Sequence, residues 1–319
     1  MSNGKTELLS PTPAGIACAA GLLSDGQLVG LPTETVYGLA GDATSDMACA
    51  RIFEAKGRPR FNPLIVHLPS LDAVERIAIL NDTARALAAT FWPGPLTMVL
   101  PLRDGHGLSP LVTAGLETVA IRLPAHPLMR AVLDAFGGPI AAPSANPSGR
   151  ISPTTAAHVL AGLDGRIAAV LDGGPCGVGL ESTILAPSGS GTRLLREGGL
   201  PREAIEPLTG ALISDTTPGK VQAPGQLSSH YAPQTPVLLN SRLTDPNAIH
   251  VSFGPGDADL SLSSSGDLIE AAAHLFSTLH AADALARARK AAAIHIAPIP
   301  DHGLGRAIND RLARAAAPR

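Results

Sequence analysis

Strand-like and helical segments alternate along most of this chain, and the alternation restricts its fold more than any other feature. Short apolar runs are separated by amphipathic stretches that begin with Pro, Ser, Thr or Asp, as helices often do. Between residues 15 and 207 the pattern predicts an α/β domain with a mixed sheet. The expected strands are 27–31, 64–67, 97–100, 119–123, 140–142, 167–171, 183–185 and 193–195, and the expected helices are 14–24, 46–56 with Asp46 as N-cap, 82–91, 127–136 and 154–163.

A proline- and glycine-rich segment interrupts this alternation after residue 207. Residues 208–235 show little apolar periodicity and predict an extended linker. Strands expected at 237–239, 250–253 and 293–297, with helices at 268–279 and 305–315, predict a smaller open α/β domain beyond it. We therefore expect an N-terminal domain at 1–207, the linker at 208–235 and a C-terminal domain at 236–319.

Composition narrows the class of protein. The net charge of −3 provides no global field that would recruit nucleic acid or an anionic membrane. The three cysteines, Cys18, Cys49 and Cys176, are far apart and form no C-x-x-C pair, which favours a reducing compartment. The sequence shows neither a signal peptide nor an apolar run long enough to span a membrane. These observations predict a cytoplasmic protein without a membrane partner.

The common nucleotide and zinc signatures are missing. Gly4–Lys5–Thr6 resembles the end of a P-loop, but no glycine precedes it at the required spacing. The ten histidines contain no H-E-x-x-H motif, so a tightly bound zinc is not expected. Any chemistry must therefore come from less familiar groups of residues.

Polar clusters follow several predicted strands, where α/β proteins place ligands. Lysine is rare here, so Lys56 beside Arg58 indicates an anion site; the alternative is a solvated helix end whose cations complement the helix dipole. Arg122 ends an apolar strand, where it can bind a carboxylate or pair with a neighbouring acid. The loop at 142–149 offers hydroxyls, an amide and backbone N–H groups for phosphate, or forms an ordinary Ser/Asn turn.

Taken together, these strings resemble the YrdC-like family of threonylcarbamoyl-AMP synthases in its long, two-domain form. The larger domain carries P-T-E-T-V-Y-G-L at 32–39, K-x-R at Lys56 and Arg58, W-P-G-P-L-T at 92–97, S-x-N at Ser144 and Asn146, and E-S-T-I at 181–184. The S-H-Y-A-P string at 229–233 resembles the linker of that form, and residues 303–311 resemble its C-terminal domain. Each string is weak alone, but their shared order and spacing are specific.

The resemblance implies a twisted sheet around a concave pocket, capped by the second domain. It implies that L-threonine, bicarbonate or carbon dioxide, and ATP give threonylcarbamoyl-adenylate and pyrophosphate, for t6A modification of tRNA. Mg²⁺ would be held through the phosphates, and the catalytic residues would be Lys56, Arg58, Ser144 and Asn146. ATP would also meet Asn62, Thr118, Ser152, Arg196 and Tyr231, and threonine would meet Thr35, His67, Arg122, Ala142 and Ser182.

The implied partner is a downstream threonylcarbamoyl transferase, with tRNA bound only indirectly or weakly. Two other functions compete with this interpretation. One is a carbamoyl-adenylating maturation enzyme, although this chain lacks the cysteines and length of its usual extra modules. The other is a non-enzymatic RNA-binding module, which predicts salt-dependent RNA binding without ATP turnover.

Overall fold

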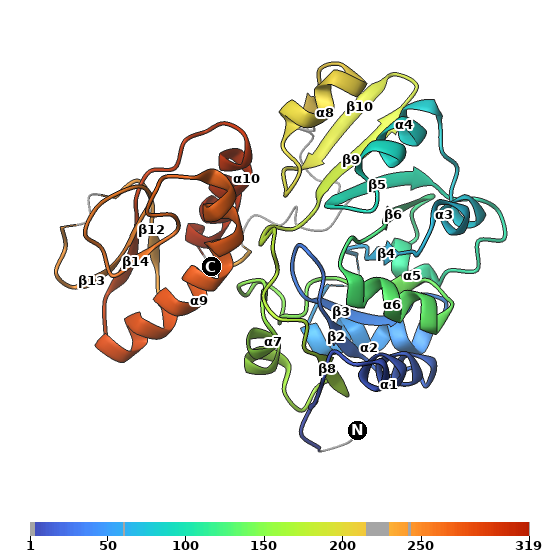
Figure 1. Cartoon of the computed structure of the whole chain (residues 1–319), viewed down its shortest axis with the longest axis horizontal. Helices are drawn as coiled ribbons and strands as arrows, with labels where there is room; N and C mark the ends of the chain where they lie inside the picture. Colours follow the sequence, from blue (N-terminus) through green and yellow to red (C-terminus); the bar gives the residue numbers. More distant parts are fainter. Residues whose placement is uncertain (1–3, 60, 215–229, 242–243, 319) are drawn as a thin grey trace.

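Figure 1 shows a larger N-terminal domain and a smaller C-terminal domain, each with its own sheet. The structure is a computed structural model that describes residues 4–59, 61–214, 230–241 and 244–318. The strands of the larger domain are β1 (Glu7–Leu9), β2 (Val29–Leu31), β3 (Gly38–Asp42), β4 (Ile65–His67), β5 (Leu96–Pro101), β6 (Thr118–Arg122), β7 (Ile140–Ala141), β8 (Ala169–Leu171), β9 (Thr183–Ser188), β10 (Gly191–Arg196) and β11 (Ile213–Ser214). Its helices are α1 (Pro13–Ser24), α2 (Asp46–Lys56), α3 (Leu71–Ile77), α4 (Asp82–Phe91), α5 (Pro110–Thr113), α6 (Pro127–Phe136), α7 (Ala156–Leu163) and α8 (Arg202–Thr209).

Among the described residues, the larger sheet has 11 strands in the order β1-β8-β2-β3-β7-β4-β6-β5-β9-β10-β11. β4 pairs with β6 and β5 with β9 in parallel, whereas β5–β6 and β9–β10 are antiparallel. The predicted α/β fold with a mixed sheet is therefore confirmed. In the middle of the sheet, His67 of β4 stands opposite Arg122 of β6 and Ile140 of β7. This register places the ends of three strands at one point.

The cap of α2 differs from the prediction. Ser45, not Asp46, is the N-cap: its backbone is extended and its side chain accepts a hydrogen bond from the Ala48 N–H. Asp46 lies in the first turn, where a carboxylate complements the helix dipole. The helix ends at Lys56 because Gly57 adopts φ of 60°, a left-handed conformation that glycine tolerates. The turn at Gly57 directs the following residues back towards the sheet.

The smaller domain contains β12 (Val237–Leu238), β13 (Ala248–Ser252), β14 (Leu260–Ser261), β15 (Ala293–Ile296), α9 (Leu268–Arg289) and α10 (Leu304–Ala316). Its strands run parallel in the order β12-β15-β13-β14. α9 continues ten residues past the predicted end at Leu279, with Ala282 and Ala286 still buried against the domain. Figure 1 shows α9 and α10 between the small sheet and the larger domain.

The segment expected as a linker divides into three parts. Leu208 and Thr209 complete α8, and β11 adds to β10, so residues up to 214 extend the larger domain. Residues 215–229, including Ser229 of the S-H-Y-A-P string, lie outside the described residues. Residues after this stretch contact both domains: the His230 N–H donates to the Arg314 carbonyl, and the Ala232 N–H to the Gly149 carbonyl.

The two domains share an apolar interface. Val36, Ile151 and Leu180 of the larger domain belong to the same buried cluster as the core of the smaller domain. Gly179 lies so close to α9 that an added Cβ would stand 2.4 Å from the Ala272 carbonyl oxygen, so glycine is required there. In the part of the chain that the structure describes, no helix is both long and apolar enough to cross a membrane.

Candidate active site

A cavity lies where the ends of β4 and β6 meet the segment that precedes the smaller domain. It is lined by nine of the residues predicted for the site: Thr35, Arg58, His67, Arg122, Ala142, Ser144, Ser182, Arg196 and Tyr231. Prediction missed seven further lining residues: Thr33, Val36, Gly38, Ile65, Pro143, Glu181 and His230. Most of the missed residues are neighbours of predicted ones within the same strings, and adjacency was the signal that could have found them.

Lys56 organises the loop that follows β7. Its side chain is almost fully buried, and Nζ donates to the carbonyls of Ser144 and Asn146, both at 2.6 Å. The backbone of the same loop is held by Tyr37 and Lys56 carbonyls, which accept from the N–H groups of Ala145 and Ser148. Burial, with Arg58 nearby, lowers the pKa of Lys56, while the two carbonyls favour its charged form. Lys56 is thus a buried clamp, and the interpretation as a solvated helix end is wrong.

Arg58 is the cation that faces the cavity from this side. It is 8% exposed, and it donates from Nε to the Asn62 carbonyl at 3.3 Å and from Nη2 to the Pro63 carbonyl at 2.9 Å. Burial lowers its pKa to about 10, which still leaves the guanidinium charged at neutral pH. Asn62 therefore supports Arg58 through its backbone, while the cavity itself is lined by Arg58.

Arg122 pairs with a neighbouring acid, which is one of the two roles that the sequence left open for it. Its Nη2 lies 2.6 Å from Glu34 Oε1, and Nη1 donates to Thr35 Oγ1 at 2.7 Å. Burial would raise the pKa of Glu34, but Arg122 outweighs it and the pKa is lowered. His67 stands opposite Arg122 in the sheet; burial first, then Arg122, lowers its pKa to about 3, so its imidazole is neutral at pH 7.

Ser182 and Arg196 form the next wall. Arg196 donates from Nη2 to the Ser182 carbonyl at 2.8 Å and to its hydroxyl at 3.2 Å, and Ser182 Oγ lies 2.6 Å from Thr97 Oγ1. Burial lowers the pKa of Arg196 to about 10. Gly198 permits the close approach of these strands, because an added Cβ would stand 2.4 Å from the Glu181 carbonyl oxygen. The E-S-T-I string at 181–184 and the residues Arg196–Gly198 are thus brought together as one structural unit.

Glu181 receives partners from both domains. Ser152 Oγ donates to Oε1 at 2.6 Å, and Arg311 Nε of α10 donates to Oε2 at 3.0 Å. Burial would raise the pKa of Glu181, but Arg311, Arg196 and Ser152 together lower it. Ser152 reaches the site through this carboxylate rather than by lining the cavity. The contact with Arg311 has no counterpart in the sequence analysis.

His230 and Tyr231 close the cavity. Tyr231 is 1% exposed, with φ of 63°, a left-handed conformation uncommon for residues other than glycine. Its ring packs at 5.5 Å between centroids on Phe276 of α9, and burial raises its pKa. Burial lowers the pKa of His230 to about 3. The volume of the cavity is about 50 Å³, room for a few waters, whereas ligand pockets span roughly 300–1,000 Å³.

Five predicted residues do not line the cavity. Lys56, Asn62, Asn146 and Ser152 lie directly behind it, in contact with lining residues. Thr118 opens β6, opposite Pro101, at the far end of the strand from Arg122. Among the described residues, no group of three or more His, Cys, Asp or Glu side chains could hold a metal ion.

Both halves of the chain match known proteins. Residues 21–198 match the family model described as telomere recombination, and residues 200–317 match that of the threonylcarbamoyl-AMP synthase C-terminal domain. A threonylcarbamoyl-AMP synthase of Bacillus subtilis is 48% identical over 240 residues, 73% of this chain and 69% of that protein. One from Pyrococcus abyssi is 45% identical over 230 residues, 70% of this chain and 67% of that protein.

A solved structure agrees with these matches. The crystal structure of Pyrococcus abyssi Sua5 complexed with L-threonine is similar to this structure with a TM-score of 0.89, at 35% identity, covering 98% of each chain. The agreement extends over both domains, as do the two family models. The chain therefore belongs to the threonylcarbamoyl-AMP synthase family.

Proposed function

We propose that this protein makes threonylcarbamoyl-AMP from L-threonine, bicarbonate or carbon dioxide, and ATP, and releases pyrophosphate. The observation that supports this most is convergence: side chains from strings between residues 33 and 231 line one cavity, with two arginines on one side and the Arg122–Glu34 pair on another. A site of this kind suits one reactant with several phosphates and one small zwitterion. The product supplies the threonylcarbamoyl group for t6A in tRNA.

The reaction needs no nucleophile from the protein. The threonine amine adds to carbon dioxide and loses a proton, which gives a carbamate. A carbamate oxygen then attacks the α-phosphorus of ATP, a new P–O bond forms, and the bond to pyrophosphate breaks. The protein contributes by positioning the reactants and by stabilising the negative charge that develops on the phosphates.

We assign the phosphate side to Arg58, Arg196 and the loop that carries Ser144 and Asn146. Arg58 and Arg196 line the cavity and keep their charge, because their pKa values of about 10 remain well above 7. Lys56 fixes the loop through two carbonyls, from directly behind Ser144 and Asn146. Guanidinium groups and backbone N–H groups suit phosphate oxygens.

We assign the threonine side to Thr35, His67, Arg122, Ala142 and Ser182. Arg122 already pairs with Glu34, so the threonine carboxylate shares this guanidinium with Glu34 rather than meeting an isolated cation. The neutral imidazole of His67 and the methyl group of Ala142 give the apolar contact that the threonine methyl requires. Specificity over serine then rests on one methyl group, worth roughly 1–3 kcal/mol in a fitted pocket.

Mg²⁺ enters with ATP in this proposal and is held by phosphate oxygens and water. Among the described residues, Glu181, which lines the cavity, and Glu34, which lies beside the lining residue Thr35, are both paired with arginines. The pocket therefore supplies cations and hydroxyls to the complex rather than a carboxylate cage for the metal.

We further propose that residues 230 and 231 act as a lid. The cavity of about 50 Å³ is too small for a nucleotide, and His230 and Tyr231 both line it. Tyr231 combines a strained backbone with a ring that can cover a nucleotide and still form a hydrogen bond. Its movement would admit ATP, and its return would keep water from the product, an anhydride that water hydrolyses.

The product passes to a transferase that modifies tRNA, and we place the whole process in the cytoplasm. The net charge of −3 agrees with weak or indirect contact with tRNA. The three cysteines in the described residues are free, as expected for a reducing compartment.

Pyrophosphate release tests this function when each reactant is omitted in turn. We expect release only when ATP, L-threonine and bicarbonate are all present, with L-serine a poorer substrate. Equal release without any amino acid would overturn the assignment. Turnover that needs carbamoyl phosphate instead would identify the maturation-type enzyme, and salt-dependent RNA binding without turnover would identify the RNA-binding module.

A further inference from the structure

One side chain of the smaller domain reaches the wall of the cavity. Arg311 of α10 is 0% exposed, and its Nε donates to Glu181 Oε2 at 3.0 Å. Its Nη1 donates to Asp310 Oδ2 at 2.9 Å, and its Cζ lies 5.5 Å from the centroid of the Tyr231 ring. Arg311 thus contacts Glu181, the one carboxylate among the described residues that line the cavity together with Arg58, Arg196 and Tyr231.

The Glu181 carboxylate would weaken phosphate binding on the phosphate side of the cavity if its position were not fixed. It lines the same cavity as Arg58 and Arg196, and Arg196 is the second largest electrostatic influence on it after Arg311. A buried carboxylate that loses its partner pairs with the nearest cation or becomes protonated. In this pocket the nearest cations are those assigned to the triphosphate.

We propose that Arg311 is a positioning residue for ATP, supplied by the second domain. It holds the Glu181 carboxylate on the side away from the phosphates, so that Glu181 does not compete with the triphosphate for Arg196 and Arg58. It also sets the closed position of Tyr231 through the face of its ring. This inference rests on the proposed synthase function, and it gives the C-terminal domain a part in the site.

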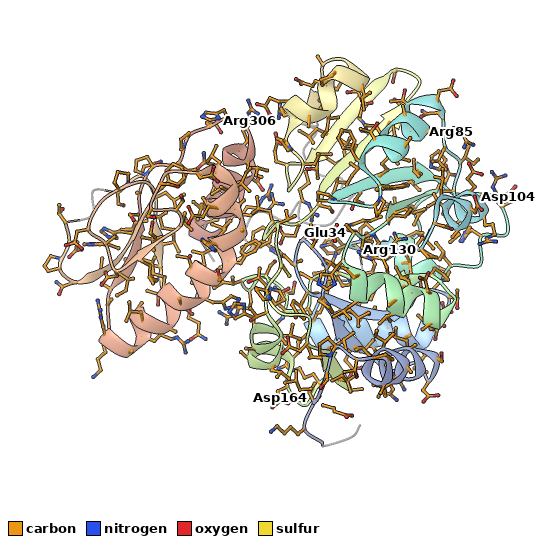
Figure 2. The ribbon with its side chains drawn as sticks, in the orientation of Figure 1. Glu34, Arg85, Asp104, Arg130, Asp164 and Arg306 are labelled. Atoms are coloured by element: carbon orange, nitrogen blue, oxygen red, sulfur yellow. The ribbon has the colours of Figure 1, made fainter. Side chains whose placement is uncertain are left out.

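The chain offers a matched control on the same helix. Arg306 also joins the two domains, through an ion pair of 2.7 Å between Nη1 and Glu203 Oε1 of α8. The pair is partly exposed, and Arg306 does not line the cavity. Figure 2 shows Arg306 at the end of α10 facing the larger domain, well away from Glu34 at the centre of the molecule. A general need for domain docking would involve Arg306 as much as Arg311.

The test measures pyrophosphate release against ATP concentration in five variants: Arg311→Gln, Arg311→Lys, Glu181→Gln, the Arg311→Gln/Glu181→Gln pair and the control Arg306→Ala. Parent enzyme is first shown to require threonine and bicarbonate; if it does not, the proposed function fails, which is a separate result. We expect Arg311→Gln to lower kcat/KM for ATP about 100-fold, mostly through KM, because binding at the phosphates is weakened. Arg311→Lys should recover part of the loss, and Arg306→Ala should stay within about twofold of the parent.

The paired variant separates positioning from folding. In the Glu181→Gln background no carboxylate competes, so adding Arg311→Gln should cost less than about threefold, and this pair buries no unpaired charge. Acidification should partly restore the Arg311→Gln variant, because protonated Glu181 no longer competes. Equal losses in the two backgrounds, or an Arg306→Ala loss as large as that of Arg311→Gln, would overturn the inference. If Arg311→Gln does not fold, the comparison of the pair with Glu181→Gln alone decides in the same way.

Discussion

The two sides of the cavity are built in different ways. On the side of the larger domain, backbone register fixes the geometry: β4 lies between β6 and β7, and Lys56 clamps the loop after β7 through two carbonyls. On the other side, Tyr231 and Arg311 approach from the segment before the smaller domain and from α10. Their side chains are held by contacts with other side chains, and single backbone hydrogen bonds at His230 and Ala232 flank Tyr231.

The difference indicates that the side built by the larger domain is rigid, whereas the other side can move. We call the strand ends of β4 and β6 with the loop after β7 the floor, and Tyr231 with Arg311 the cover. A strand end inside a large sheet cannot shift without breaking its ladder, whereas a tyrosine held by a ring contact and a cation over its face can leave its position at a modest cost. The contacts that we propose for phosphate and threonine lie on or next to the floor. The residues that we propose to open for ATP lie on the cover.

The largest expected effect comes from removing the Arg58 side chain, next to the floor of the cavity. We expect Arg58→Ala to lower kcat roughly 10²–10³-fold, as the loss of one preorganised donor does. Since Arg58 donates to the carbonyls of Asn62 and Pro63, the free energy of unfolding should also fall by about 1–3 kcal/mol. A solvated cation at a helix end, the alternative left open by the sequence, would contribute only about 0.3–1 kcal/mol.

Arg166 is the control for this change. Its Nη1 donates to the Ala55 carbonyl at 3.4 Å, at the other side of α2 and away from the cavity lining. Arg166→Ala should keep full turnover while lowering the melting temperature slightly. Normal turnover in Arg58→Ala, with only a lower melting temperature, would reduce Arg58 to a structural role.

A smaller effect is expected from removing the cover. Tyr231→Ala should weaken ATP binding and shorten the lifetime of threonylcarbamoyl-AMP on the enzyme, while both domains stay folded. Binding by equilibrium titration and the decay of the adenylate in single turnover are the two measurements. Phe276→Leu changes the packing partner of Tyr231 without changing a residue of the cavity. If both variants loosen the smaller domain and neither alters ATP affinity or adenylate lifetime, Tyr231 only packs the domains together.

The smallest expected effect is on the pH dependence of stability, and it comes from two histidines at the interface between the domains. His158 of α7 and His280 of α9 stack across the domain interface at 3.9 Å between ring centroids. Burial, then His158, lowers the pKa of His280 to about 4 from 6.5. The unfolded chain therefore binds more protons between these values, so this part of the stability is complete above pH 6.5 and is lost as the pH falls towards 4.

His280→Gln removes that titration. At about 1.4 kcal/mol per pKa unit the shift sets an upper bound near 3 kcal/mol, and solvent screening of the partly exposed ring reduces it. We expect the melting temperature of the variant to fall less than that of the parent between pH 6.5 and 4. An identical pH dependence of the melting temperature in the two proteins would show that the histidine stack does not contribute to the pH dependence of stability.

Most elements were predictable from the sequence because their signals are local. Helices such as α1 and α6 begin with proline at the first turn and carry apolar residues at helical spacing. β3 was missed because Gly-Leu-Ala-Gly-Asp has two glycines and no β-branched residue; it is a strand because β2 and β7 pair with it on both edges. α9 was ended too early because its alanine-rich second half lacks a strong apolar pattern.

The site was predictable as a set of residues but not as a set of contacts. The strings pointed to nine lining residues, but the partners of Lys56 lie 88 and 90 residues away, and the partner of Arg311 lies 130 residues away. Only the fold brings such residues together, so the sequence could not show that Lys56 is buried or that Glu34 is the acid that pairs with Arg122. Glu181 was seen in its string, and its role appears only with α10 in place.

The most direct test of the central claim is the identity of the product. Parent enzyme is mixed with ATP, L-threonine and ¹³C-labelled bicarbonate, and the adenylates formed in a single turnover are measured by mass spectrometry. We predict an adenylate that contains threonine and one labelled carbon, formed together with an equal amount of pyrophosphate. Pyrophosphate release without this labelled adenylate, or a labelled adenylate that lacks threonine, would contradict the account.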